Sequence, residues 1–389
     1  MGNRVFVTGL AAVCGEANSI EDIWHSICTE RQLSATTSSN EFLVEKAALG
    51  KSDAKILARH QIMALAVVEQ AWTKAGLSKA RNSLRGEGKT FRDERFGCFG
   101  GSALGGLTVL LEESASSKGV SPYGLSRWRG NAIGAVTGIR FGLGGANFSL
   151  NAASATGSQL LCLAGMCIQS GLMDAAVVVA ADILPADYIS RAMGANGSLT
   201  TDRKALPLSE GRKGMAPSEG AACIILESEK RVRLRETHPI MEWCGGGMAN
   251  EAFHLLAPLP NGDVLCKLLH DAKKLAKDKI DWLSLHATGT SKFDLIETAA
   301  VAAVFGNERP WLSAFKRTTG HTLAAAGIIE AALLGTGFVT ATVPPWPQNT
   351  DPALQLNFCR PTQFSAPKTA LQIGQGMGGN VVVNLFRAV

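Results

Sequence analysis

Short apolar runs alternate with longer amphipathic runs along the first half of the chain. A short apolar run between glycine-rich or polar stretches predicts a buried strand, whereas apolar residues recurring every three or four positions predict a helix. The pattern predicts a strand that ends at Gly9, helices over 19–30 and 53–76, an exposed loop over 77–94 and a further loop over 184–221. Residues 116–135 show no clear period. The other strands expected in this half lie at 95–101, 175–181 and 221–228.

The same alternation begins again near His238. The elements expected after it are strands at 241–250, 280–290 and 311–316, helices at 260–277, 294–306 and 321–338, and two apolar runs around a glycine turn at 374–380. Strands that alternate with helices and read as continuous apolar runs are typical of a parallel sheet covered on both faces. We therefore expect an α/β protein built from two similar halves, residues 1–236 and 237–389.

Composition and charge give no indication of nucleic-acid binding, of a membrane span or of a metal site. The 389 residues are 46% hydrophobic and 18% charged, and the net charge is +5. This mild charge, without a basic run interleaved with aromatic residues, does not indicate nucleic-acid binding. We expect no membrane span, since no segment has eighteen consecutive apolar residues. The nine cysteines are scattered without a metal-ligand spacing, which predicts free thiols in the cytoplasm and no metal site.

Residues 147–183 place a serine where α/β enzymes hold a nucleophile. The run of small residues around Ser154 precedes a predicted helix of more than four turns that ends at Gly171. Free N–H groups and the helix dipole at such a start stabilise an anion. A hydroxyl nevertheless needs a base within hydrogen-bond reach, and no residue near Ser154 in the sequence supplies one. Ser154 lies in Ala-Ser-Ala, so the Gly-x-Ser-x-Gly elbow of serine hydrolases is absent.

Two of the seven histidines lie in glycine-flanked turns after predicted strands of the second half. His286 follows an apolar strand, and His321 follows Gly320 shortly after Lys316. Active sites of open α/β sheets gather at the carboxyl ends of strands, where two imidazoles could stabilise a developing oxyanion. Asp294 and Glu297 begin the next helix, and we expect them to have a structural role near the site.

Five blocks in order then make the whole chain resemble a β-ketoacyl-[acyl carrier protein] synthase of the thiolase fold, the ketosynthase family. They are RVFVTGLAAV, the Ala152–Gly157 block, PLSEGRKGMAPSEGAACIILE, the His286 block with Asp294 eight residues on, and the Lys316–His321 block. The resemblance implies an α-β-α-β-α body of five layers that dimerises through the first half. In that family a cysteine takes the acyl chain, and two histidines assist decarboxylation of malonyl-carrier protein. It also implies no cofactor, because acyl groups arrive on the phosphopantetheine of an acyl carrier protein.

The chain departs from the family pattern at several site positions. Ser154 replaces the nucleophilic cysteine, and the reference pKa of a thiol, about 8.5, lies well below that of a hydroxyl. Ala152 replaces a threonine, and Lys213 replaces an aspartate. Met215 and Met377 each replace a phenylalanine, and Met377 lies in the gate loop. The remaining candidates for substrate binding or gating are Thr288, Thr290, Gly376, Gly378 and Gly379.

Several functions remain open. The chain resembles a chain-length factor, a non-condensing subunit that shapes the acyl pocket of a partner ketosynthase, with residual malonyl decarboxylation. Alternatively, it is a synthase silenced by a Cys-to-Ser change at 154, or a serine acyltransferase or hydrolase. The first reading implies a heterodimer with a Cys-containing ketosynthase and the second a homodimer. Basic residues that could meet an acidic carrier protein are Arg59, Lys74, Lys79, Arg81, Arg203, Lys204, Arg212 and Lys213.

Overall fold

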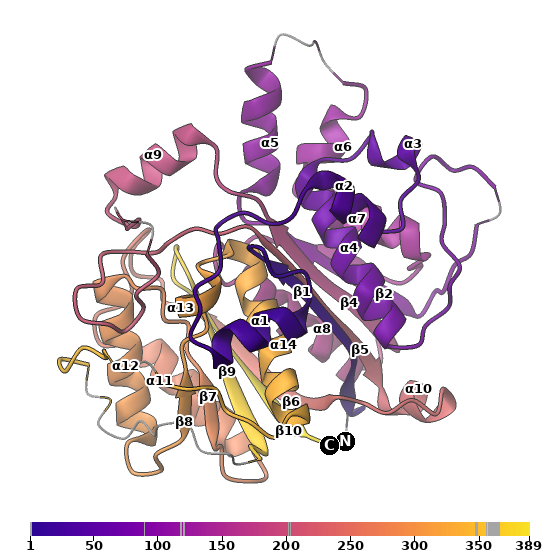
Figure 1. Cartoon of the computed structure of the whole chain (residues 1–389). Helices are drawn as coiled ribbons and strands as arrows, with labels where there is room; N and C mark the ends of the chain where they lie inside the picture. Colours follow the sequence, from indigo (N-terminus) through magenta and orange to yellow (C-terminus); the bar gives the residue numbers. More distant parts are fainter. Residues whose placement is uncertain are drawn as a thin grey trace.

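Ten strands form one mixed sheet in the part of the chain that the computed structural model describes (Figure 1). That part is every residue except 1, 89, 117, 118, 120, 201, 203, 347, 348, 355 and 357–365. The strand order is β3-β2-β4-β5-β1-β6-β10-β9-β7-β8. The strands are β1 (Val5–Cys14), β2 (Phe96–Gly101), β3 (Asn147–Ser149), β4 (Ala175–Asp182), β5 (Gly220–Ser228), β6 (Met241–Asn250), β7 (Trp282–Ser284), β8 (Trp311–Ser313), β9 (Thr369–Gly376) and β10 (Asn380–Ala388).

The two halves of the sheet repeat one topology. From the outer edge of the sheet to its middle, the strands of the first half come in the order β3, β2, β4, β5, β1. The strands of the second half come in the order β8, β7, β9, β10, β6. In each half this is the third, second, fourth, fifth and first strand of that half. The halves join where β1 pairs antiparallel with β6, with Val5 opposite Trp243. This repeat agrees with the expected pair of similar halves. The boundary at residues 236 and 237 falls between α10 (Glu229–Leu234) and β6 and stays a prediction.

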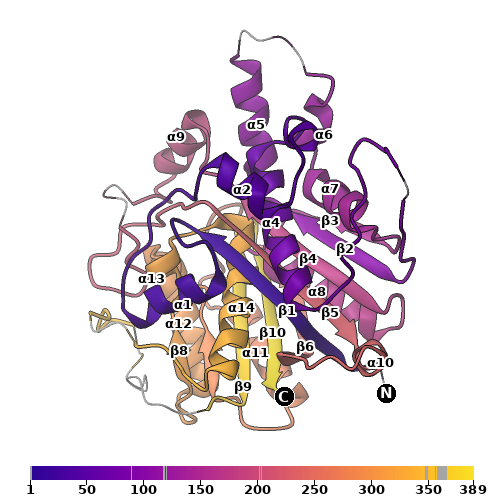
Figure 2. The same ribbon diagram turned by 45° about the vertical axis from the view of Figure 1, so that its right-hand side comes forward.

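Helices form three layers around the two halves of the sheet. The central helices α8 (Thr156–Gln169) and α14 (Ala326–Val339) contact each other and strands of both halves (Figure 2). On the outer faces, α4 (Arg59–Lys74) and α7 (Ala132–Phe141) cover the first half, and α11 (Asp263–Leu275) and α12 (Ser291–Phe305) cover the second. Three separate apolar cores fill the spaces between these layers. The order is helix, sheet, helix, sheet, helix, which confirms the predicted thiolase-like α/β fold.

The expectation of a wholly parallel sheet was wrong. Only β2 with β3 and β4, and β7 with β8 and β9, pair in parallel. The pairs of β1 with β5 and β6, of β4 with β5, and of β10 with β6 and β9 are antiparallel. Every strand packed on both faces is apolar whichever way its neighbour runs, so hydrophobicity alone does not reveal strand direction.

Several predicted boundaries also differ. Strand β1 continues past Gly9, where an added Cβ would lie 2.3 Å from the Ala71 carbonyl oxygen. Glycine is therefore needed there for the close approach of α4, and it does not end the strand. The helix expected over 53–76 is divided into α3 (Lys51–Ala54) and α4, and the helix after Ser154 ends at Gln169, before Gly171.

Additional short helices lie in segments without a clear sequence period. The segment 116–135 contains α6 (Gly124–Trp128) and the start of α7, and the loop expected over 184–221 contains α9 (Asp187–Ala195). The elements not yet named are α1 (Ile20–Cys28), α2 (Asn40–Lys46), α5 (Gly105–Ser114), α13 (Lys316–Thr319) and the 3₁₀ turn η1 (Leu323–Ala325).

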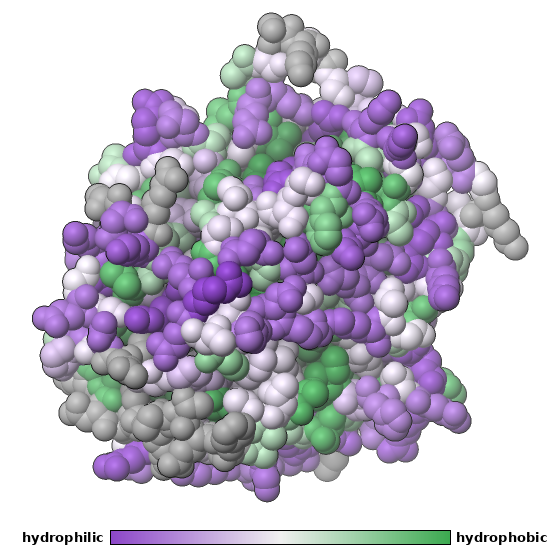
Figure 3. Space-filling view, in the orientation of Figure 1, coloured by the Kyte–Doolittle hydropathy of each residue, from purple (hydrophilic) through white to green (hydrophobic). Residues whose placement is uncertain are grey.

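The face seen in Figure 3 is mostly hydrophilic, with apolar side chains in small separate patches. No helix in the described part of the chain has the length and hydropathy needed to span a bilayer. None of the eight cysteines that the structure describes forms a disulfide, and Cys359 lies outside the described residues.

Candidate active site

One small pocket brings together residues that are far apart in the sequence. Its cavity of about 30 Å³ has room for ~2 water molecules. Its lining consists of Ser154, Met215, His286, Thr288, Thr290, Phe293, His321, Gln375, Gly376 and Met377. All of these except Phe293 and Gln375 were site candidates in the sequence. Gly378 and Gly379 do not line it but make the adjoining β9–β10 turn, with φ of +82° and +78°.

Ser154 sits on a sharp turn immediately before α8. Ala153 has φ +51°, and the Thr156 hydroxyl braces this turn by accepting from Ala152 N (2.8 Å) and donating to Ala153 O (2.6 Å). Across the pocket, a Cβ on Gly376 would lie 2.3 Å from Ala152 O, so only glycine allows β9 to approach the turn. No residue in the described structure hydrogen-bonds to the Ser154 hydroxyl. It therefore has the position of a nucleophile without a base.

The two histidines approach each other from two turns, one after β7 and the other after α13. His286 lies two residues after β7, and its ring centroid is 5.8 Å from that of His321 in an edge-to-face arrangement. The backbone N–H of Leu323 donates to His321 Nδ1 (3.2 Å). Because Nδ1 accepts, the proton of the neutral ring is on Nε2, and this buried nitrogen has no partner among the described residues. His321 thus offers an unused N–H donor at the pocket.

Lys316 orients the other imidazole from behind the pocket. Its ammonium group donates to the His286 carbonyl oxygen (2.6 Å), lies 3.4 Å from His286 Nδ1 and forms a buried ion pair with Glu330. A cation beside Nδ1 favours the tautomer in which that nitrogen accepts and Nε2 carries the proton. Both rings are therefore arranged as Nε2–H donors.

Burial keeps both imidazoles neutral. It lowers the pKa of His286 and that of His321 well below the usual value, and the positive charge of Lys316 lowers both further. Neutral imidazoles can donate a hydrogen bond to a developing oxyanion without first losing a proton.

This pKa shift predicts a spectroscopic result. From about pH 8 to about pH 6, the ring Cε1–H NMR signals of His286 and His321 should stay at the chemical shift of the neutral ring, since the folded pKa lies below this window. In the urea-unfolded chain the same rings should titrate near their reference pKa of about 6.5. Signals are assigned with His286→Gln and His321→Gln variants. A native titration centred near the reference value would contradict the assignment.

Asp294 and Glu297 hold the backbone of the site and do not face the pocket. Glu297 accepts from the N–H groups of His286 (2.6 Å) and Ala287 (2.8 Å), and Asp294 accepts from those of Leu208 (2.8 Å) and Gly289 (3.1 Å). Burial raises the pKa of Asp294 to about 6 and that of Glu297 to about 7. Both carboxylates therefore bind backbone N–H groups, and their structural role near the site stays a prediction.

Sequence reasoning missed a buried carboxylate that ties two of the site's turns together. Asp182, at the end of β4, accepts from the Ser102 hydroxyl, from three backbone N–H groups at 103–105 and from Ala324 N, at 2.6–2.9 Å. Ala324 lies three residues after His321. The available signal was a single acid that ends an otherwise apolar strand.

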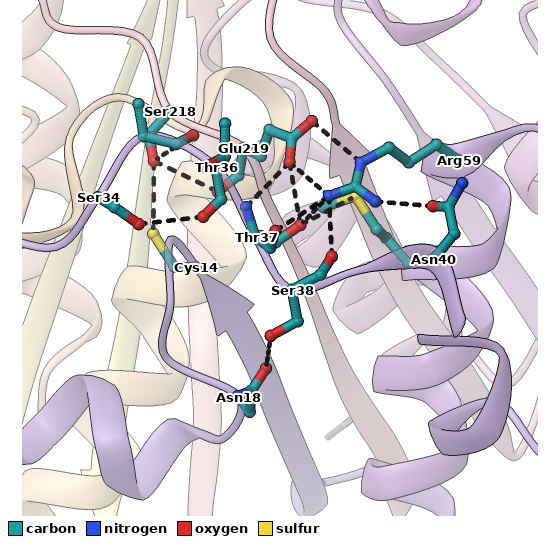
Figure 4. A network of polar contacts seen from close by, with 12 residues as sticks. Cys14, Asn18, Ser34, Thr36, Thr37, Ser38, Asn40, Arg59, Ser218 and Glu219 are labelled. Atoms are coloured by element: carbon teal, nitrogen blue, oxygen red, sulfur yellow. Dashed lines mark hydrogen bonds and ion pairs between the residues drawn. The ribbon is translucent and has the colours of Figure 1, made fainter. Parts of the chain in front are cut away.

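Figure 4 shows a second network of polar contacts, which includes Arg59, Ser218 and Glu219. Arg59, which we expected among the carrier-facing basic residues, instead contacts Glu219 (2.8 Å) and the Thr37 hydroxyl (2.8 Å). The neighbouring Ser218 donates its N–H to the His321 carbonyl oxygen (3.1 Å). Arg59 therefore binds the segment whose neighbouring residue contacts the backbone of His321.

Of the other predicted carrier-facing residues, Lys79, Lys204 and Lys213 are exposed, and their contact with a carrier protein stays a prediction. Ion pairs join Lys74 to Glu21, Arg81 to Glu69, and Arg212 to Asp351 and Asp294. Arg203 lies outside the described residues. Within the described ranges, no group of three or more His, Cys, Asp or Glu side chains could hold a metal ion.

Comparisons with known proteins agree with this geometry. Residues 38–231 match the beta-ketoacyl synthase N-terminal domain, and residues 242–348 match the C-terminal domain. The chain is 24% identical to 3-oxoacyl-[acyl-carrier-protein] synthase 2 of Coxiella burnetii, over 97% of this chain and 96% of that protein.

Two solved structures share the fold over the full length of both chains. A beta-ketoacyl synthase from Burkholderia phymatum superposes with a TM-score of 0.87 at 22% identity. The ishigamide ketosynthase/chain length factor superposes with a TM-score of 0.82 at 21% identity. Since the two domain models together span most of the sequence, the chain belongs to the beta-ketoacyl synthase family.

Proposed function

We propose that this chain is a chain-length-factor-like subunit whose own pocket decarboxylates malonyl-carrier protein without condensing it. One observation carries the proposal: two neutral imidazoles with Nε2–H donors meet at a pocket whose serine has no base. The donors needed to stabilise an enolate are present, whereas an activated nucleophile to hold an acyl chain is absent.

In the proposed reaction the thioester carbonyl oxygen of the malonyl group accepts hydrogen bonds from His286 and His321. The bond between C2 and the carboxylate carbon then breaks, CO₂ leaves, and the electron pair forms an enolate held by the two N–H donors. A proton from water at C2 completes acetyl-carrier protein. Lys316 acts as a positioning residue that maintains the tautomer of His286, and no cofactor is needed.

The lining of the pocket supports the lack of condensation. Met215 and Met377 lie in its wall, where the family pattern has two phenylalanines, and Ser154 is the residue at the nucleophile position. A dipole effect of about 1 kcal/mol at the start of α8 is too small to ionise the hydroxyl of Ser154. Long acyl chains would therefore be held by a partner.

We propose that the partner is a Cys-containing ketosynthase, and that the acyl groups arrive on an acyl carrier protein in the cytoplasm. Strand β3 ends the sheet with exposed residues, among them Phe148. An edge strand with free backbone groups is suited to pair with another chain. Because β3 belongs to the first half, it supports association through the half that carries Ser154.

The test is mass spectrometry of malonyl-carrier protein incubated with this chain alone. We expect acetyl-carrier protein to accumulate above the rate without protein, while the mass of the chain stays unchanged because Ser154 takes no acyl group. A stable acyl adduct at Ser154 would favour the serine acyltransferase and contradict the proposal, as would the absence of any decarboxylation.

A second candidate, a synthase silenced at Ser154, is favoured by one observation. The strained turn at Ala153 and the close contact of Gly376 with Ala152 retain the geometry of a nucleophile elbow. A homodimer that condenses after Ser154→Cys replacement would support this candidate. Co-purification with a Cys-containing homologue would support the chain-length-factor reading.

A further inference from the structure

A second cavity lies at the end of β9 and β10 that is remote from the active site. Its volume of about 400 Å³ is within the size range of small-molecule sites. Thr369, which begins β9, lines this cavity, whereas Gly376, which ends β9, lines the active-site pocket. A strand rises ~3.3 Å per residue, so these two residues are about 20 Å apart. Both ends of the chain lie on this side of the molecule, at the bottom of Figure 1.

Two polar side chains reach this cavity from neighbouring strands. Arg387 of β10 lies directly opposite Thr369 of β9 in their antiparallel pairing, and both line the cavity. Residues that are directly opposite point to the same face of the sheet, with Cβ atoms ~5 Å apart. One ligand group can therefore contact both side chains.

The hydroxyl of Thr369 lacks a partner. No residue in the described part of the chain hydrogen-bonds to it, although Thr369 is only 3% exposed. The backbone of this residue is satisfied, because its N–H donates to an Asp281 carboxylate oxygen and its carbonyl oxygen accepts from Asp281 N (3.1 Å each). Leaving a buried hydroxyl unpaired costs free energy. A ligand that accepts from this hydroxyl would remove that cost.

Arg387 has unused donors and belongs to a cluster with surplus positive charge. Its Nη2 donates to Glu242, and no described residue accepts from its Nε or Nη1. Glu242 also accepts from Arg4 through both carboxylate oxygens (2.8 and 2.9 Å). Arg4 approaches Glu229 as well (3.4 Å), but Glu229 is paired with Arg233. Three arginines therefore share two carboxylates, and one positive charge is left without a partner.

The rest of the cavity wall adds apolar surface and no further net charge. Lys277 and Asp278 both line it, are exposed and have opposite charges. Burial raises the pKa of Cys244 to about 11, so this thiol in the wall is uncharged at neutral pH. Leu275 and Leu385 provide aliphatic surface in the same cavity. The lining therefore suits a ligand that has one negative charge and an aliphatic part.

We propose that this cavity binds an amphipathic monocarboxylate, with its carboxylate on Arg387 and Thr369 and its alkyl chain against Leu275 and Leu385. The carboxylate accepts from the free donors of both polar side chains, and hydrogen bonds between charged partners are the stronger kind. It also supplies the negative charge that the arginine cluster lacks. A phosphate monoester carries about −1.5 to −2 charges near neutral pH, which exceeds the single spare positive charge and is repelled by Glu242.

The experiment is calorimetric titration of the full chain with hexanoate, hexanol and hexyl phosphate. The three probes share one alkyl chain and differ in the charge of the head group. We expect hexanoate to bind at least about tenfold more tightly than hexanol, because only the carboxylate forms charge-assisted hydrogen bonds with Arg387. Hexyl phosphate should bind more weakly than hexanoate.

Two variants locate the site. Arg387→Gln should weaken hexanoate binding at least about tenfold, and Thr369→Val should weaken it about three- to tenfold. Thr369→Val should not lower the Tm, because it removes an unpaired buried hydroxyl, and it keeps the test decisive if Arg387→Gln destabilises the fold. The matched control is Arg127→Gln, which should retain the affinity. Arg127 pairs with Glu113 outside the cavity, and its side chain is 19% exposed, against 24% for Arg387.

The outcomes that would overturn the proposal are distinct from failure of the decarboxylation test. Absence of hexanoate binding, equal binding of hexanol or tighter binding of hexyl phosphate would contradict it. A hexanoate affinity that survives Arg387→Gln or Thr369→Val would place the ligand in another pocket and contradict it as well. Binding of hexanoate requires no turnover, so a chain that leaves malonyl-carrier protein unchanged would lose the proposed function and retain this site.

Discussion

Ser154→Cys should become acylated by an acyl-carrier protein about 10²–10⁴ times faster than the native chain. This is the range that a positioned general base contributes to catalysis, and the native hydroxyl lacks one. A thiol has a reference pKa of about 8.5 and is a strong nucleophile without such help. The braced turn at Ala153 and the start of α8 already position the side chain at residue 154. Intact-protein mass spectrometry after timed quenching measures the covalent acyl-enzyme.

The control for this prediction is Ser158→Cys. Ser158 lies one helical turn further along α8 and is buried, and its hydroxyl already accepts from Gln372 Nε2. A thiol at this position should not be acylated. If Ser154→Cys also remains unmodified, the pocket excludes acyl chains by its shape, because the thiol removes the chemical obstacle. Condensation by Ser154→Cys with malonyl-carrier protein would indicate the silenced synthase.

His321→Ala should lower the rate of malonyl-carrier-protein decarboxylation by about 10²–10³. Removing one donor from an oxyanion site typically has an effect of this size. His321 Nε2 is enclosed and without a partner in the described structure, so its N–H is free for the enolate oxygen. The change should appear in kcat more than in KM, because the bond strengthens as the negative charge develops. The measurement is the initial rate of acetyl-carrier-protein formation.

His60→Leu provides the matched control. Burial lowers the pKa of His60 to about 4, and its Nδ1 is also enclosed without a partner among the described residues. It lies on α4, outside the pocket. Loss of a buried neutral imidazole at this position should leave the decarboxylation rate within a factor of about two. If both His60→Leu and His321→Ala lower the decarboxylation rate by the same factor, general destabilisation explains both effects. That result would contradict the proposed donor role of His321.

The sequence by itself determined the features that depend on local pattern. Apolar runs between glycine-rich turns located the strands, because a strand buried on both faces needs only apolar residues over a short length. The glycine turn at 374–380 correctly placed the β9–β10 hairpin. The resemblance of five sequence blocks to the ketosynthase family pointed to His286, Lys316 and His321, and these residues lie in or beside one pocket.

Only the tertiary structure decided strand direction and the polar partners of buried groups. Whether β5 runs parallel or antiparallel to β4 depends on a connection of many residues, and both arrangements bury the same apolar side chains. Arg59 and Glu219 are 160 residues apart in the sequence. Asp182 accepts hydrogen bonds from Ala103 in the first half of the chain and from Ala324 in the second. Gln372 and Gln375 have the same side chain in one strand, yet one amide is satisfied and the other is free. A hydrogen bond depends on which group lies within about 3 Å, and the packing of distant segments sets that distance.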